Sequence, residues 1–414
     1  MQDEIKNNID NPKFLEKLYR NDKVTFKRAF NKIFQEIKDN PTSQIWNERL
    51  NFENEEISWG ARNELTFVII ASIIAGLIAK IPDFMAIEDE FFYSRNLAFI
   101  VFPLLTAYFF WRQKSHPKKL VIASVAFLIS IFYINLLPNN TKSDTLILAC
   151  IHLPLFLWTV LGYIFVGDNL KNYQKRIDFL RYNGDLIVLT AIILISGGIL
   201  TGITLGLFNL IEVDIKEFYF NYIVIFGLAA TPIIGTYLVQ TNPQLVNKVS
   251  PVIAMVFTPL VLVTLIIYLL AVIGTGKDPY NDRDFLLIFN LLLIGVMAII
   301  LFSIAETSKN SKSKIGTWLL FSLAIVTGIV NGIALSAILF RISEWGITPN
   351  RLAVLGGNIL ILTNLLMVTY KLYKTIKNFD ERENIEKSIA IFLPIYSIWT
   401  VIVTFIFPLI FNFK

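Results

Sequence analysis

The densest group of side chains that could bind a ligand lies in the stretch RISEWGITPNR, which begins at Arg341. Arg341 and Glu344 stand three residues apart, so they can form an ion pair on one helix face. Gly346 predicts a turn, and Thr348 followed by proline predicts the start of the next helix. Arg351 could then donate hydrogen bonds to Glu344 or to a lipid phosphate. The stretch is either a staple that fixes a helical hairpin at a membrane surface or a binding site for a solute or headgroup.

Amide side chains inside long apolar runs form a second group of candidates. They are Asn290, Asn331, Asn358 and Asn364. An amide surrounded by hydrocarbon must find hydrogen-bond partners on neighbouring helices, so these asparagines either lock helices together or line a polar cavity. His152 also lies inside an apolar run. A single histidine there is more typical of a hydrogen bond between helices than of a ligand site, although its titration could give a pH response.

Two stripes of small residues indicate close helix contacts. Glycines recur at four-residue spacing at Gly198, Gly202 and Gly206, and again at Gly328 and Gly332. This spacing places each set on one helix face, where a second helix can approach closely. We expect helix packing within the chain, and the alternatives are a glycine-lined substrate path and a homodimer seam.

Residue patterns typical of catalysis or cofactor binding are missing from the sequence. It has no nucleophile elbow, no Walker loop, no HExxH and no CxxC motif. One cysteine, Cys150, and two histidines are too few to build a zinc or haem site. We therefore predict no catalytic residues, no metal and no cofactor, and we do not expect an enzyme.

The composition predicts the elements that must position these residues. Of the 414 residues, 55% are hydrophobic and 17% are charged, whereas about 25% of the residues of a soluble protein are charged. From Glu64 onward, apolar runs recur that approach the roughly 20 residues a helix needs to cross a bilayer. This pattern excludes a soluble enzyme, a disordered chain and a fibrous protein. It predicts an all-α, multi-pass transmembrane helical bundle.

Eleven membrane spans are predicted. They lie near residues 65–81, 96–111, 119–137, 145–166, 186–211, 219–239, 251–273, 285–304, 315–340, 352–373 and 388–411. The second span is the shortest, so it could be re-entrant. No Asp, Glu, Lys or Arg lies near the centre of a predicted span, where a charge commonly marks a proton relay, a voltage sensor or an ion site. The sequence therefore disfavours a carboxylate-driven pump and a voltage sensor.

Positive charges in the connections predict the orientation of the bundle. Of the 26 Lys and Arg residues after residue 63, 17 belong to one alternating set of connections and 9 to the other. Basic residues favour cytoplasmic loops, so we expect the N-terminus in the cytoplasm and the C-terminus on the opposite side. The net charge of +5 fits loops beside an anionic lipid bilayer and requires no nucleic-acid partner.

Residues 1–63 form a separate segment with 11 basic and 11 acidic residues. Asn11 followed by proline predicts one short helix, a second carries Phe26 and Phe30 on one apolar face, and a third surrounds Trp46. Three short helices make a thin core. We therefore expect their apolar faces to rest on the membrane domain, on the bilayer or on a partner protein.

RISEWGITPNRLAVL resembles the hallmark of a bacterial family of polytopic membrane proteins, domain-of-unknown-function family 4153. The family usually has tyrosine where this chain has Trp345. The stretch RYNGDLIVLTAIILISGGILTGITLGLF is similar to the family's glycine-rich span and its entry, which adds Asn183 and Asp185 as candidates. LEKLYRNDKVTFKRAF and WNERL are similar to the N-terminal extension of some members. The resemblance implies a bacterial inner-membrane protein, whose C-terminus would then be periplasmic, and it implies no activity.

Two functions remain open at this point. The spans, glycine stripes and amides indicate a transporter-like protein for a neutral or lipidic small solute. The alternative is a non-transporting sensor or scaffold, in which residues 1–63 dock a cytoplasmic partner through the face that carries Phe30.

Overall fold

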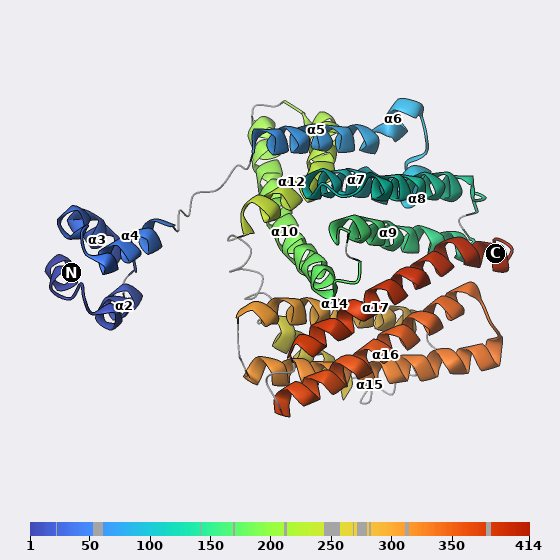
Figure 1. Ribbon diagram of the computed structural model, residues 1–414. Helices are drawn as coiled ribbons and strands as arrows, with labels where there is room; N and C mark the ends of the chain where they lie inside the picture. Colours follow the sequence, from blue (N-terminus) through green and yellow to red (C-terminus); the bar gives the residue numbers. More distant parts are fainter. Residues whose placement is uncertain are drawn as a thin grey trace. The chain divides into compact units, whose positions relative to one another are not determined.

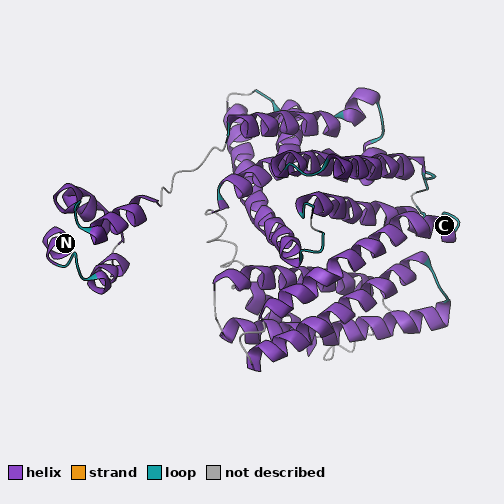
Figure 2. Ribbon diagram, in the orientation of Figure 1, coloured by secondary structure: helices purple, strands orange, loops and turns teal. Residues whose placement is uncertain are grey.

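The computed structural model describes residues 1–21, 23–52, 61–140, 142–168, 170–210, 213–243, 257–267, 269–270, 280, 283–310, 314–377 and 382–414 (Figure 1). The regular structure in these ranges is helical, and they contain no strand (Figure 2). The prediction of an all-α fold is therefore confirmed. The chain divides into two compact units, Met1–Ser58 and Trp59–Lys414. They are called the N-terminal unit and the membrane unit below.

Short helices build the N-terminal unit. They are α1 Gln2–Asn7, α2 Pro12–Asn21, α3 Lys23–Ile37 and α4 Pro41–Phe52, of which α1 was not predicted. Asn11 caps α2, because its side chain accepts a hydrogen bond from the backbone N–H of Phe14 at 3.1 Å. On the surface, a hydrogen bond from Arg20 holds the pKa of the Glu16 carboxyl below its usual range.

The apolar face of α3 is buried inside the N-terminal unit. Phe26 and Phe30 are fully buried, and Phe26 lies against Trp46 of α4 with ring centroids 5.1 Å apart. Ile5 of α1 and Leu15 of α2 complete this core. The expectation that this face rests on the membrane domain, the bilayer or a partner is therefore wrong for Phe26 and Phe30, because helices of the same unit cover them.

Long apolar helices build the membrane unit. Nine helices in its described part are long and apolar enough to cross a membrane, and the shorter apolar helices Phe257–Ile267 and Phe289–Ala305 lie in the two remaining predicted spans. The bounds are α5 Arg62–Ala79, α6 Ile81–Met85, α7 Asp89–Gln113, α8 Pro117–Leu136, α9 Asp144–Phe165, α10 Tyr173–Leu210, α11 Lys216–Phe218, η1 Tyr219–Val224 (a π-helical turn), α12 Ile225–Thr241, α14 Arg283–Asn310, α15 Lys314–Trp345, α16 Pro349–Lys377, α17 Arg382–Val401, η3 Ile402–Ile406 (also π-helical) and α18 Phe407–Ile410.

The outside of the membrane unit is apolar. Large side chains such as Ile69, Ile129 and Ile151 are 51%, 58% and 58% exposed. In the most apolar stretch of α10, only 6% of the residues are buried inside the unit. In the corresponding stretch of α7 the buried share of residues is 50%. A soluble protein rarely exposes so much contiguous apolar surface, whereas hydrocarbon solvates it well. The chain is an integral membrane protein.

The helices of the membrane unit form two groups, each with its own core (Figure 1). The α5 half consists of α5, α7, α8, α9 and α12, and the α14 half consists of the helix Phe257–Ile267 and α14 to α17. α10 joins them, because Ile177 belongs to the core of the α14 half while Phe179 and Tyr182 belong to the core of the α5 half.

Two helices, α7 and α10, begin seven or more residues before the predicted spans. α7 begins at Asp89 and has 25 residues, which is enough to cross a bilayer. α10 begins at Tyr173, so Asn183 and Asp185 lie on a helix and not in a connection. In both cases polar residues near the helix start are buried against neighbouring helices, which an apolar run in the sequence does not reveal.

Candidate functional site

The RISEWGITPNR stretch forms the connection between α15 and α16. Gly346 has a φ of 74°, in the left-handed region that favours glycine, and its N–H donates to the carbonyl of Ile342 at 2.9 Å. The Thr348 hydroxyl accepts a hydrogen bond from the backbone N–H of Arg351 at 3.3 Å and so caps α16. The predicted turn and helix start are confirmed.

The two arginines of this hairpin contact Trp345. Arg351 donates hydrogen bonds to the carbonyls of Trp345 and Gly346, at 2.8 and 2.7 Å. The guanidinium carbons of Arg341 and Arg351 lie 5.2 and 5.7 Å from the Trp345 ring centroid. Neither arginine forms an ion pair with Glu344, so that predicted pair is wrong for these described residues. The geometry favours the structural staple, and ligand binding here stays a prediction.

Three of the four predicted amides join helices of the α14 half. Asn358 Nδ2 donates to Asn290 Oδ1 at 2.9 Å, and Asn364 Nδ2 donates to the Tyr396 hydroxyl at 3.0 Å. The prediction that amides join neighbouring helices is therefore confirmed for Asn290, Asn358 and Asn364. Asn331 is fully buried in α15, and neither polar atom of its side chain has a hydrogen-bond partner in the described part of the chain.

His152 bonds within its own helix. Its Nδ1 lies 2.9 Å from the carbonyl oxygen of Leu148, one turn earlier in α9. The predicted hydrogen bond from His152 to another helix is therefore wrong, because the described hydrogen bond of its ring lies within α9.

Asn183 and its neighbours connect α10 to both halves of the membrane unit. Trp158 of α9 donates a hydrogen bond to Asn183 Oδ1 at 2.8 Å. A Cβ added at Gly184 would overlap the ring of Phe302 in α14, and Arg181 donates to the carbonyl of Ala305 at 3.1 and 2.6 Å. Asp185, one turn further along α10, is buried. These contacts make the segment a structural junction, and ligand binding at Asn183 and Asp185 stays a prediction.

The glycine stripes are not packed as predicted. Among the described residues, no atom lies within 4 Å of a Cβ built at Gly198, Gly202, Gly328 or Gly332, and the surroundings of Gly206 lie outside the described residues. Packing of these four glycines against the described part of the chain is therefore wrong, because the spacing of glycines defines a helix face but not the element that covers it. Close packing occurs instead at glycines that stand outside the stripes. Examples are Gly162 against Phe179, Gly235 against Leu186 and Gly356 against Trp399.

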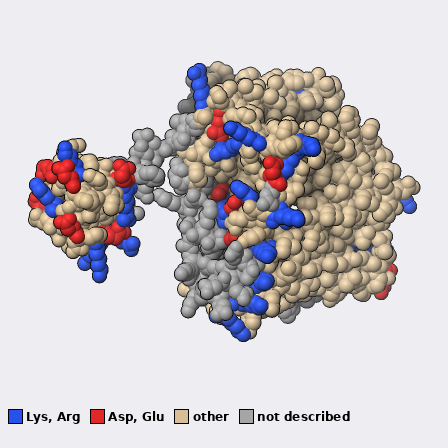
Figure 3. Space-filling model, viewed as in Figure 1, with Lys and Arg blue, Asp and Glu red and all other residues tan. Residues whose placement is uncertain are grey.

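Charged side chains gather at one end of the α5 half, called the Arg112 end. Glu64 accepts hydrogen bonds from Tyr108 and Arg112, and Arg112 also donates to the carbonyl of Gln240 at 3.0 Å. Lys119 donates to the carbonyl of Gly167. Figure 3 shows a band of charged side chains on the side where α5 begins, while most of the remaining visible surface of the membrane unit is uncharged.

The opposite end of the α5 half, called the Arg95 end, contains a buried arginine. Arg95 lies in the second turn of α7, is 3% exposed, and donates hydrogen bonds to the carbonyls of Ile134 and Leu137, where α8 ends. It also donates to Asn139 Oδ1 at 3.3 Å. Beside it, Asn96 and Asn135 exchange two amide hydrogen bonds of 2.9 and 2.8 Å. These bonds tie α7 to α8 and fix the guanidinium.

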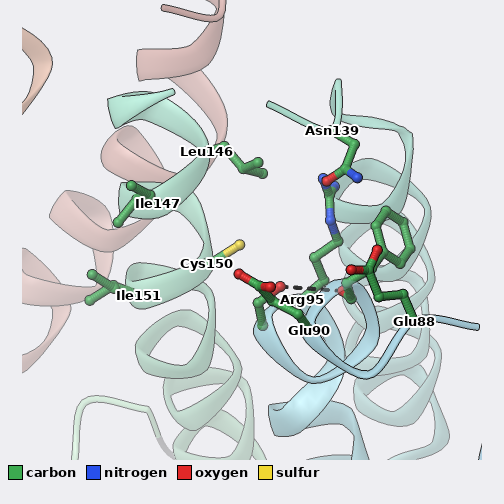
Figure 4. A pocket seen from close by; sticks show the side chains of 10 residues that line it. Glu88, Glu90, Arg95, Asn139, Leu146, Ile147, Cys150 and Ile151 are labelled. Carbon is green, nitrogen blue, oxygen red and sulfur yellow. Dashed lines mark hydrogen bonds between the residues drawn. The ribbon is translucent and has the colours of Figure 1, made fainter. Parts of the chain in front are cut away.

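A cavity of about 470 Å³ lies next to this guanidinium, between the start of α7 and the start of α9 (Figure 4). We call it the Arg95 cavity; its lining residues are Glu88, Glu90, Phe91, Ser94, Arg95, Asn139, Leu146, Ile147, Cys150 and Ile151.

The lining of the Arg95 cavity is polar on one side and apolar on the other. Carboxylate, guanidinium, hydroxyl and amide groups come from α7 and from the segment after α8, whereas the α9 side is mainly aliphatic. Ile147 and Ile151 are 44% and 58% exposed on the outside of the bundle, so the apolar wall continues into the surface that hydrocarbon covers. Such a lining suits an amphiphile, with its polar part near Arg95 and its apolar part along α9.

The sequence interpretation did not select Arg95. It placed the start of the second span one residue after this arginine. The available signal was an arginine followed by an asparagine at the start of an apolar run, because two such polar residues at a membrane boundary need partners on another helix.

Comparisons with known proteins give no further assignment. No protein-family model matches the chain, and no characterised protein or solved structure is significantly similar to it. The resemblance to domain-of-unknown-function family 4153 stays a prediction.

Proposed function

We propose that this integral membrane protein is transporter-like and binds a lipid-like amphiphile in the Arg95 cavity before moving it across the bilayer. The observation that carries the proposal is the two-sided lining of the cavity. A buried guanidinium faces one side of the space, and isoleucines exposed to hydrocarbon form the other. A neutral polar solute or a free ion would leave this apolar wall without a partner.

The place of Arg95 along α7 supports the same class of ligand. It lies six residues after the start of the helix, which corresponds to a depth of roughly 9 Å at 1.5 Å per residue. Arginine at this depth is typical of contacts with lipid phosphates, because its long side chain reaches the headgroup region. A lipid could enter sideways, past Ile147 and Ile151, without first leaving the bilayer.

The charge pattern supports an orientation for this entry. Most basic residues of the connections belong to the set that includes the Arg112 end, and positive charge favours the cytoplasm. The Arg95 end would then face the periplasm of a bacterial inner membrane. The amphiphile would enter from the outer leaflet.

A matched pair of variants tests the proposal. Ile151 and Ile129 are both 58% exposed on the outside of the bundle, but only Ile151 lines the Arg95 cavity. Ile151→Trp should narrow the cavity, whereas Ile129→Trp should change only the lipid-facing surface. The measurement is the transbilayer movement of an acyl-labelled fluorescent phospholipid in proteoliposomes.

The expected result is rapid lipid movement with the wild-type protein and with Ile129→Trp, and a several-fold slower rate with Ile151→Trp. Movement no faster than in protein-free vesicles would contradict transport of this solute class. Equal rates for the two variants would contradict the assignment of the entry site.

A further inference from the structure

The charges of the Arg95 cavity are of both signs. Glu88 and Glu90 provide two carboxylates at its rim, and Arg95 provides one guanidinium within it. No ion pair joins Arg95 to either glutamate among these described residues, so the opposite charges are held apart. An anionic headgroup would meet two carboxylates beside one cation, and a purely cationic ligand would meet the buried guanidinium.

The order of these groups along the bundle is also informative. Glu88 directly precedes α7 and Arg95 follows seven residues later, which places the Cα atom of Arg95 roughly 10 Å deeper at 1.5 Å per residue. On the facing helix, Ile147 and Ile151 are the fourth and eighth residues of α9, which places them roughly 5 and 10 Å from its start. Along the α7 side a ligand therefore meets carboxylate and then guanidinium, while aliphatic side chains of α9 line the other side over the same depth.

We propose that the Arg95 cavity selects a phospholipid with a zwitterionic phosphoethanolamine headgroup. The ammonium would lie at Glu88 and Glu90, the phosphate at Arg95, and an acyl chain along Ile147 and Ile151. The carboxylates and the guanidinium follow one another along α7 as ammonium and phosphate do in the headgroup, and the α9 side of the cavity offers the apolar surface that an acyl chain needs. The inference rests on the proposed function, because it presumes that an amphiphile occupies the cavity.

The primary ammonium is the distinguishing group. It carries three N–H donors that carboxylates accept as charge-assisted hydrogen bonds. A phosphocholine headgroup has no such donor, and a phosphoglycerol headgroup has no positive charge. Glu88 and Glu90 should therefore favour phosphatidylethanolamine over both.

Cys150 offers a direct probe, because it lines the cavity and is the only cysteine of the chain. The full-length protein is placed in nonionic detergent alone, or in nanodiscs of phosphatidylcholine with and without added phosphatidylethanolamine or phosphatidylglycerol. The rate of N-ethylmaleimide addition is then followed by intact-protein mass. A bound headgroup and chain should shield the thiol.

The expected result is alkylation several-fold slower with phosphatidylethanolamine than with either other lipid. Glu88→Gln with Glu90→Gln should remove this difference, and because both side chains are exposed, the double variant should keep its fold. Soluble glycerophosphoethanolamine should not slow the reaction, since it lacks the acyl chain that α9 would contact.

Three results would overturn the inference. Equal shielding by all three phospholipids, but stronger than in detergent, would refute headgroup selection and leave amphiphile binding intact. No shielding by any phospholipid would refute the proposed function as well. Shielding by glycerophosphoethanolamine alone would indicate a site for a soluble headgroup and not for a lipid.

Discussion

The two halves of the membrane unit bury polar groups in different ways. The α5 half buries charged side chains at both of its ends: Glu64 and Lys119 at the Arg112 end, Lys80 and Arg95 at the other. Its core contains many aromatic rings. In the described part of the α14 half, the core is mostly aliphatic, and its buried polar groups are mainly uncharged hydroxyls and amides, with Glu386 as a buried carboxylate. The amides lie near the helix midpoints.

This difference separates two uses of polarity in a bilayer. Charges at helix ends lie close to water and headgroups, so their burial costs less than at mid-depth. There they bind backbone carbonyls and leave a lined cavity, as Arg95 does. Amides at mid-depth have no access to water or headgroups, so they form hydrogen bonds with other side chains, as Asn358 does with Asn290. Ligand chemistry is therefore expected in the α5 half and structural locking in the α14 half.

The largest expected effect distinguishes the buried Arg95 from the half-buried Arg341. Arg95→Leu removes the donor to two carbonyls at the end of α8 and should cost about 3 kcal/mol of stability, since buried carbonyls would lose charged partners. Arg341→Leu removes only the contact with the Trp345 ring, worth about 0.5 kcal/mol. Thermal unfolding in detergent, followed by far-ultraviolet circular dichroism, measures both. Similar losses would show that Arg95 is not the anchor described here.

Neighbouring glycines of α16 test the packing of the α14 half. A Cβ at Gly356 would overlap the Trp399 indole, whereas one at Gly357 would meet no atom of the described residues within 4 Å. Gly356→Ala should therefore destabilise by about 1–3 kcal/mol through overpacking. Gly357→Ala should be neutral or stabilise by up to about 1 kcal/mol, because alanine favours helix. The same unfolding assay decides, and a stable Gly356→Ala variant would count against this helix contact.

The smallest effect concerns the amides at mid-depth. Asn358→Leu removes the hydrogen bond from Asn358 to Asn290 Oδ1 and should cost about 0.6–1.7 kcal/mol. Asn331→Leu should be neutral or slightly stabilising, because its amide already lacks a described partner and leucine adds no desolvation cost. Equal destabilisation by both substitutions would indicate that Asn331 has a role which its contacts do not reveal.

The fold followed from the sequence more fully than the site did. Apolar runs fix where a chain can cross hydrocarbon, so predicted spans such as 119–137 and 145–166 agree with α8 and α9 to within two residues. The Arg95 cavity depends on carbonyls 39 and 42 residues further along the chain. No local pattern encodes that contact.

Contacts between distant parts of the chain also explain why two predictions were wrong. The spacing of Gly198 and Gly202 predicts a helix face but not its neighbour, and no described residue packs against these glycines. The Phe30 face predicts burial, and α1, an unpredicted helix, contributes to its cover. A partner for the N-terminal unit stays a prediction. Because Phe30 is buried inside this unit, the partner would have to bind other residues.

Retention of lipid by the purified protein tests the central claim most directly. Native mass spectrometry from mild detergent should find a bound phospholipid on the wild-type chain and on Ile129→Trp, and should find it lost from Ile151→Trp. Identical lipid retention by Ile151→Trp and the wild-type chain would contradict the claim that the Arg95 cavity holds an amphiphile.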